Sequence, residues 1–284
     1  MAGTAMRLAR RTTPITPTKE CAVHGVKYKP VAFVHINKAG GTWMRDVLVK
    51  YARHQMVEAA MPQAGPKLRV LGSRFFHASA SLQRRALGQA DWDRSYRFAL
   101  VRNPFARQLS MFTFLLQEAG CRFPKSRRPE HCEQRFLPEA GPWLSNHTEV
   151  GIQFRQWIRR LALAHPHNTV DAHLFGARSH GNEIDPWYNA SQLSWLVERS
   201  GTLLVEVIRL EELRSAWPKL QASICGLERI TYEQTTQSSS QARRNPSRHL
   251  HYSFYYDDAT RRTVESYMAA DLATFGYTFE NDSK

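Results

Sequence analysis

The feature that most constrains the fold is an apolar segment followed by a glycine-containing turn and an amphipathic segment, within residues 31–51. Residues 31–36 are mostly apolar and β-branched, which is typical of a buried strand. After the turn, apolar residues recur on one face of a predicted helix: Trp43, Met44, Val47, Leu48 and Tyr51. A buried strand that enters a helix through a tight turn is typical of an α/β fold.

The turn, residues 37–42, has the composition of a phosphate-binding site. Gly40 and Gly41 let the backbone turn tightly and approach a ligand closely, because they have no Cβ. Thr42 is predicted to cap the following helix, whose free N–H groups would then point into the turn and favour an anion. Lys38 adds a positive charge at the rim. The ATP-binding P-loop places its lysine after the glycines, whereas Lys38 precedes both, so that motif is not matched.

A second candidate anion site follows the strand predicted over residues 96–101. Arg102 comes at the carboxyl end of this strand, where open α/β sheets bind their ligands. Pro104 suits the first turn of a helix, and Ser110 lies about two turns into it. The Arg102 fork and the Ser110 hydroxyl could converge on one phosphate, although Arg102 taken alone could equally cap strand carbonyls. Arg107 is interpreted as an exposed or structural residue.

The remaining pattern predicts alternating strands and helices, and therefore an α/β fold with a mainly parallel central sheet flanked by helices. Further strands are predicted over residues 68–71 and 202–208. Further helices are predicted from Ser79 or Ser81 to residue 87, over residues 150–161 and 210–220, and from the Asp257-Asp258 cap to Gly276. Residues 1–28 are interpreted as a flexible tail and residues 29–284 as a single domain with loop excursions at 117–145 and 234–250.

Composition narrows the classes of partner. A net charge of +14 over 284 residues favours anionic ligands. No apolar run approaches the ~20 residues of a membrane helix, so no membrane span is predicted. The four cysteines show no metal-ligand spacing; a local Cys121–Cys132 disulfide and free thiols remain equally open. No nucleic-acid-binding motif is present, and nucleic acid is not an expected partner.

Taken together, the two motifs resemble those of sulfotransferases that use 3′-phosphoadenosine 5′-phosphosulfate, most closely the branch with carbohydrate sulfotransferases. The segment VHINKAGGT is similar to that family's 5′-phosphosulfate turn, usually H-I-P-K-T-G-G-T, from which Asn37 and Ala39 depart. The segment FALVRNPFARQLS is similar to its 3′-phosphate strand and helix. Segments 207–213, 245–249 and 271–279 also occur there in this order, so the resemblance runs from about residue 31 to residue 279.

The resemblance implies a P-loop-NTPase-like sulfotransferase architecture and transfer of a sulfuryl group, without a metal. Lys38 would neutralise charge on the leaving group. The residues implied in donor binding are Lys38, Ala39, Gly40, Gly41, Thr42 and Trp43 at the 5′-phosphate, and Arg102 and Ser110 at the 3′-phosphate. His77 is the candidate general base, with a structural role almost as well supported. Arg248 and His249 could close over the donor but are interpreted as solvated surface residues.

Three points stay open in the sequence. The hydroxylated acceptor could be an acidic glycan, which the basic charge favours, or a small alcohol. The chain would be cytoplasmic as given, or a resident of the Golgi lumen if an anchor is missing. The alternative functions are a P-loop-like nucleotide kinase, which would need Mg²⁺ and ATP, and a non-catalytic protein that binds polyanions.

Overall fold

The structure is a computed structural model that describes residues 29–52, 56, 78–119, 146–164, 190–238 and 249–281. Within these residues the sheet contains three parallel strands, β1 (Val31–Val34), β2 (Tyr96–Val101) and β3 (Glu206–Arg209), with β2 in the centre. Because neighbouring strands run in the same direction, the chain must cross back through helices between them. The predicted fold class, α/β with a mainly parallel sheet flanked by helices, is confirmed.

The helices of the described residues have the following bounds: α1 (Gly41–Tyr51), α4 (Ala80–Leu87), α5 (Gln89–Arg94), α6 (Pro104–Ala119), α7 (His147–Ala164), α9 (Gln192–Leu196), α10 (Leu213–Ser223), α11 (Tyr232–Ser238), α12 (Asp258–Tyr267) and α13 (Ala269–Phe275), with 3-10 turns η6 (Leu210–Glu212) and η7 (Tyr252–Tyr255).

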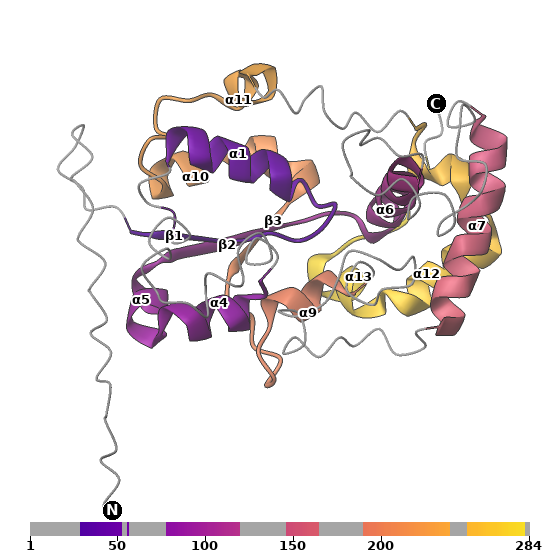
Figure 1. The fold of residues 1–284 in the computed structure, drawn as a ribbon, viewed down its shortest axis with the longest axis horizontal. Helices are drawn as coiled ribbons and strands as arrows, with labels where there is room; N and C mark the ends of the chain where they lie inside the picture. The colour runs from indigo at the N-terminus through magenta and orange to yellow at the C-terminus, as the bar shows by residue number, and fades with distance from the viewer. Residues whose placement is uncertain are drawn as a thin grey trace, which may run out of the picture.

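Helices cover both faces of the sheet (Figure 1). On one face, α1 and α10 pack against alternate strand residues such as Phe33, Phe98 and Leu100. On the other face, α4, α5 and α9 pack against the intervening residues, among them Val34 and Val101. This alternation follows from the two-residue period of a strand, and it makes the strands apolar on both sides.

A third apolar cluster lies beyond the carboxyl ends of the strands. It joins α6, α7, η7 and α12 through aromatic side chains that include Phe105, Phe112, Phe154 and Tyr255. The ring of Phe112 meets Phe154 edge-on at 5.6 Å, so α6 and α7 are fixed against each other. The cluster therefore gives α6 a rigid support at the end of the sheet where ligands bind in α/β folds.

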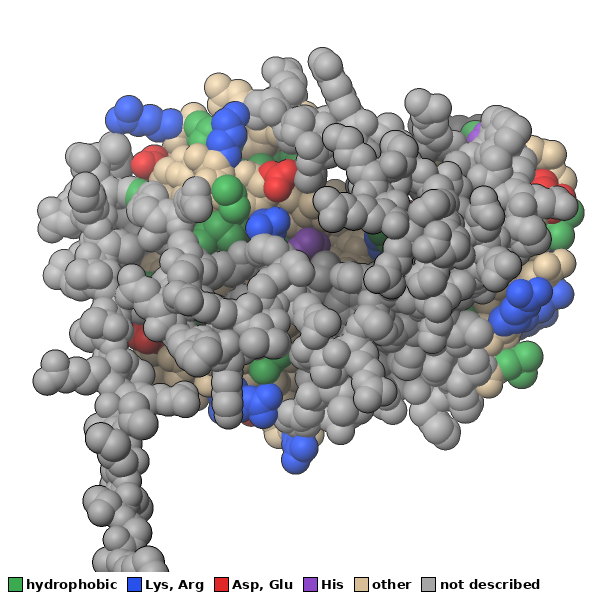
Figure 2. Space-filling model, viewed as in Figure 1, with side chains coloured by type: hydrophobic (Ala, Val, Ile, Leu, Met, Phe, Trp, Pro, Cys, Tyr) green, Lys and Arg blue, Asp and Glu red, His purple; other side chains and the backbone are tan. Residues whose placement is uncertain are grey.

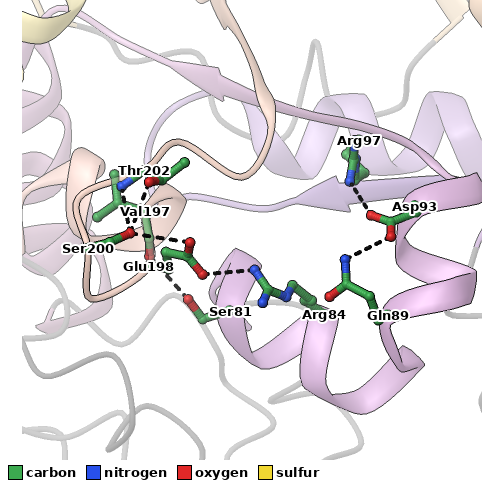
Figure 3. A network of polar contacts seen from close by, with 9 residues as sticks. All are labelled: Ser81, Arg84, Gln89, Asp93, Arg97, Val197, Glu198, Ser200 and Thr202. Carbon is green, nitrogen blue, oxygen red and sulfur yellow. Dashed lines mark hydrogen bonds and ion pairs between the residues drawn. The ribbon is translucent and has the colours of Figure 1, made fainter.

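A polar network ties α4 to the segment that leads into β3 (Figure 3). Arg84 Nη1 lies 2.8 Å from Glu198 Oε2, and the Ser81 hydroxyl donates to the Val197 carbonyl at 3.1 Å. Both side chains of the ion pair are partly exposed, so the pair itself contributes at most about 1 kcal/mol. The network fixes the position of a turn and carries no feature of a ligand site.

Several local predictions are confirmed. Ser79 caps α4 by accepting the Leu82 N–H at 3.3 Å, and Gly88 ends that helix. The predicted strand 96–101 is β2, and Pro104 is the first residue of α6. Asp257 caps α12 by accepting the Thr260 N–H at 2.7 Å, and Gly276 ends α13 in a left-handed conformation with φ of 68°.

Other local predictions are wrong or only partly correct. The first strand ends at Val34, and β3 covers only the end of the predicted 202–208 strand, because Leu203 pairs antiparallel with Val197 instead. Helix α11 lies mostly within the segment 234–250 that was predicted as a loop excursion, and α9 lies in a segment for which no helix was predicted. The single C-terminal helix is two helices that break at Met268, and after this break α13 carries Asp271 into the core beside α9.

Some predictions lie outside the described residues: the tail 1–28, the strand 68–71, most of both loop excursions, and the Cys121–Cys132 pair. Cys225 is disulfide-bonded. Within the described part of the chain, no helix has both the length and the apolar character needed to cross a bilayer.

Candidate functional site: the glycine turn and the start of α6

The turn between β1 and α1 depends on two glycines for different reasons. Gly40 has a φ of 78°, in the left-handed region, and it is the residue before the first helical residue. Gly41 has room only for hydrogen, because a Cβ there would lie 1.9 Å from Cδ2 of His35. The predicted cap at Thr42 is therefore wrong: the helix already begins at Gly41, and Gly40 caps it without a side chain.

Backbone N–H groups open onto the start of α1. The first helical hydrogen bond runs from Met44 N–H to the Gly40 carbonyl at 3.1 Å. The N–H groups of Gly41, Thr42 and Trp43 precede that bond and have no intrahelical acceptor. Thr42 is exposed, so its hydroxyl is accessible beside them. These donors at the positive end of the helix dipole suit a phosphate.

The Trp43 ring and Ala39 make contacts within the fold. The Trp43 indole N–H donates to the Thr235 carbonyl at 3.4 Å, and its ring packs against Trp217 and Tyr232. Ala39 is fully buried, and its N–H donates to the Ile36 carbonyl at 3.5 Å within the turn. The Trp43 ring therefore belongs to the core, which leaves its backbone N–H as the group that the resemblance assigns to the 5′-phosphate.

Lys38 has a strained backbone and a defined side-chain position. Its φ of 61° lies in the left-handed region, which non-glycine residues seldom adopt and which occurs preferentially at functional sites. Its Nζ lies 4.4 Å from the centroid of the Phe114 ring on α6. Ser110 lies one helical turn before Phe114, on the same face of α6. The ammonium of Lys38 is therefore held next to the face of α6 that carries Ser110.

Arg102 also reaches the turn. Its Nη1 donates to the Lys38 carbonyl at 3.4 Å, so the side chain that follows β2 contacts the loop that follows β1. Burial lowers the pKa of Arg102, and the nearby Glu211 carboxylate and Tyr277 act in the opposite direction. Ser110, 7% exposed, lies two turns further along α6. The two predicted anion motifs are thus adjacent in space.

Arg107 connects α6 to the turn from within the core. It is 1% exposed, its Nε donates to the Asn37 carbonyl at 3.0 Å, and its Nη1 donates to the Ala190 carbonyl at 3.0 Å. Burial lowers the pKa of Arg107 to about 10, with Asp271 and Tyr267 opposing this shift. Of the two sequence interpretations, exposed or structural, the structural one is confirmed. The buried hydrogen bond from Arg107 to the Asn37 carbonyl therefore fixes the distance between α6 and the glycine turn.

The sequence reasoning missed the residues that hold the Arg102 backbone. Gln192 accepts the Arg102 N–H at 2.9 Å and donates to the Arg102 carbonyl at 2.8 Å. Fully buried Asp271 in turn accepts the Gln192 N–H at 2.8 Å. Glu211 accepts the Asn103 N–H at 2.8 Å and the Tyr277 hydroxyl at 2.7 Å. Asp271 and Glu211 lie in segments that resemble the sulfotransferase family, and this resemblance could have indicated them. No feature of the sequence indicated Gln192.

Three histidines bear on the candidate site. His77, the candidate base, lies outside the described residues. His35 is buried and packs against Gly41 and Phe33. His249, interpreted as a solvated residue, is instead partly buried and lies within the electrostatic range of Arg102 and Lys38. Figure 2 shows a histidine side chain next to a basic side chain near the centre of one face.

A metal ion could be held by three or more His, Cys, Asp or Glu side chains that lie together. The described ranges contain no such group. The chemistry that the arrangement offers is cationic and hydrogen-bonding: backbone N–H groups, two hydroxyls, an ammonium and a guanidinium. Such groups bind and stabilise anionic oxygens.

Comparison with known proteins agrees with this description. The profile described as "Sulfotransferase family" matches residues 26–278 of the chain. Searches among curated proteins and among solved structures give no match. The family match spans β1, the glycine turn, Arg102, α6 and the C-terminal helices, which is nearly all of the fold described above. The chain therefore belongs to the sulfotransferase family, a family of transferases.

Proposed function

We propose that the chain transfers the sulfuryl group of 3′-phosphoadenosine 5′-phosphosulfate to the hydroxyl of an acceptor, with carbohydrates as the acceptor class. The observation that carries this proposal is the contact between the two anion motifs, in which Arg102 reaches the Lys38 carbonyl at 3.4 Å. A donor with phosphates at both ends of one nucleoside needs two such sites side by side. The family match supports sulfuryl transfer in general.

Each residue has a role in this scheme. The N–H groups of Gly40, Gly41, Thr42 and Trp43, with the Thr42 hydroxyl, hold the 5′-phosphate, and Ala39 shapes the turn. Arg102 and Ser110 hold the 3′-phosphate, which lets the site reject nucleotides that lack it. Lys38, whose ammonium lies over the Phe114 ring of α6, stabilises negative charge on the leaving oxygen. His77 removes the proton of the acceptor hydroxyl.

Catalysis in this scheme is mainly a matter of position and charge. The donor supplies an activated sulfuryl group, and the protein supplies cations and N–H groups aligned before the reaction. Burial of Arg107 and the hydrogen bonds of Gln192 to the Arg102 backbone keep that alignment fixed. The surplus of positive charge over the chain, +14, favours an acidic glycan as acceptor and would speed its encounter with the site.

The test is sulfuryl transfer from radiolabelled donor to a panel of glycans and small alcohols, with Lys38→Ala and a matched lysine variant. Lys50→Ala is the control, because Lys50 also places its ammonium over an aromatic ring, at 4.7 Å from Tyr51, but at the far end of α1. Lys38→Ala is expected to lower kcat about 100-fold or more, and Lys50→Ala to leave it unchanged. Normal turnover by Lys38→Ala would refute the assigned role.

The competing functions give different binding data. A nucleotide kinase would bind ATP with Mg²⁺ in preference to 3′,5′-bisphosphoadenosine. A polyanion-binding protein would show steep salt dependence with any polyanion and no transfer. Saturable, Mg²⁺-independent binding of 3′,5′-bisphosphoadenosine that weakens when the 3′-phosphate is absent is the expected result.

A further inference from the structure

His249 has a defined protonation pattern in the described structure. Its Nδ1 lies 2.7 Å from the Leu250 carbonyl oxygen. Because a carbonyl oxygen can only accept, Nδ1 must carry the hydrogen, and in the neutral ring Nε2 then bears a lone pair. Nε2 is buried, and none of the described residues offers it a hydrogen-bond partner. A buried polar atom in this state carries a free-energy cost that a suitable ligand would remove.

The ring is held in place by aromatic and polar contacts. It meets the Tyr255 ring edge-on, with centroids 6.2 Å apart. The Tyr255 hydroxyl accepts the Leu250 N–H at 3.0 Å and lies 2.8 Å from Nδ1 of His147, at the start of α7. His249 is thus fixed to η7 and α7, which belong to the rigid cluster that supports α6.

Among the described residues, the titratable groups that influence the pKa of His249 are cationic or neutral. Burial is the largest cause that lowers the pKa of His249, and the Arg102, Lys38 and His147 side chains lower it further, while the bond to the Leu250 carbonyl opposes them. Burial raises the pKa of Tyr255, so its hydroxyl stays neutral. Without an anion in the site, His249 is therefore neutral at pH 7, and an anion between Lys38 and Arg102 would reverse the balance.

We propose that His249 is a third cationic ligand of the donor, which takes up one proton from solvent when a donor anion binds between Lys38 and Arg102. Nε2–H then donates a hydrogen bond to an anionic oxygen of the donor. This inference rests on the proposed function and adds to it a proton-coupled step of donor binding. A ring that becomes protonated on donor binding is unsuited to remove the acceptor proton, which leaves that role to His77.

Calorimetric titration with 3′,5′-bisphosphoadenosine at pH 7.5, in buffers of different ionisation enthalpy, measures the protons taken up. Wild type is compared with His249→Gln, whose amide can donate from a similar position but cannot titrate. His251→Gln is the matched control, since His251 caps η7 through Ser253 and is not in the site. Wild type and His251→Gln are expected to take up about one proton more than His249→Gln. The nucleotide phosphates, with a pKa of about 6, can also release protons on binding, and this release cancels when the proton uptake of two variants is compared.

The outcomes separate the two proposals. Equal proton uptake by wild type and His249→Gln, with the nucleotide bound, overturns the role of His249 and leaves the proposed donor intact. Failure of wild type to bind the nucleotide overturns the proposed function and this inference with it. Proton uptake with 5′-AMP alone or with 3′-AMP alone supports the inference and identifies the phosphate that His249 contacts.

Should His249→Gln not fold, histidine-labelled wild type provides a second measurement. Its NMR titration is expected to show one histidine whose pKa rises by about two units or more when 3′,5′-bisphosphoadenosine is added, which is the rise that uptake of about one proton at pH 7.5 requires. If every histidine keeps its pKa in the nucleotide-bound protein, the inference is wrong.

Discussion

Replacing Gly41 by Ala tests the steric logic of the turn. The added Cβ would lie 1.9 Å from Cδ2 of His35, whereas ordinary contacts begin at 3.4 Å, so the ring or the helix must move by 3.4 − 1.9 = 1.5 Å. His35 is 6% exposed and stacks on Phe33, which packs on Phe98 at 5.0 Å, so displacement of the ring disturbs the sheet core. Overpacking of this kind costs about 3 kcal/mol.

The effect on binding should be at least as large. A shift of the start of α1 moves the N–H groups of Gly41 and Thr42 relative to Lys38 and Arg102. Displacements of about 1 Å in a preorganised site lower activity on the order of 100-fold. We therefore expect Gly41→Ala to weaken 3′,5′-bisphosphoadenosine binding strongly, as measured by titration, and to lower the urea midpoint of unfolding.

A double-mutant cycle with His35→Ala identifies the cause. Without the His35 ring, the Gly41→Ala cost should nearly vanish, giving a coupling energy of about 3 kcal/mol. Gly88→Ala is the control. Gly88 has a φ of 82° and a ψ of 155°, and a Cβ added to it would have no neighbour within 4 Å, so backbone strain of about 1–3 kcal/mol, no coupling to His35→Ala and unchanged binding are expected. If Gly41→Ala costs the same with and without the ring, the close approach is not the reason for glycine at this position.

Two further predictions follow from buried contacts. Gln192→Ala leaves the Arg102 N–H and carbonyl without their partner, so it should cost about 2–3 kcal/mol of stability. It should also weaken the binding of nucleotides with a 3′-phosphate but not the binding of 5′-AMP. Gln89→Ala, at an exposed glutamine that bonds to Asp93, should change neither stability nor binding. Burial, and after it Glu206, raises the pKa of Tyr96 from 10.0 to about 12. The protonated form therefore stabilises the fold below pH 10, and this contribution is lost as the pH rises towards 12. Urea unfolding across that range should show the loss of stability in wild type and a smaller loss in Tyr96→Phe, whereas an identical loss in both would assign it to other groups.

Structural features that depend on a few neighbouring residues were predicted well. Ser79, Asp257 and Gly276 mark helix ends because their side chains or backbone conformations act on the adjacent turn alone. The apolar character of residues 96–101 predicted a buried strand because both faces of the sheet are covered. The sequence pattern did not predict the exact helix ends where neighbouring residues could serve equally well. The cap of α1 is Gly40 and not Thr42, and the C-terminal helix breaks at Met268.

The candidate site shows the same division. The sequence indicated Lys38, the glycines, Arg102 and Ser110, because their residue types in that order after two strands are typical of anion binding. It did not indicate that Arg107 would join α6 to the turn, or that Gln192 and Asp271 would hold the Arg102 backbone.

By itself, then, the sequence determined the α/β class, the anion-binding turn and the family resemblance. The tertiary structure alone decided which side chains meet: Gln192 reaches Arg102 across 90 residues, and Glu211 reaches Asn103 across 108. The physical reason is that a hydrogen bond or a ring contact depends on distance in space, and packing of the helices on the sheet sets that distance. The protonation of His249 likewise depends on charges that only folding brings near it.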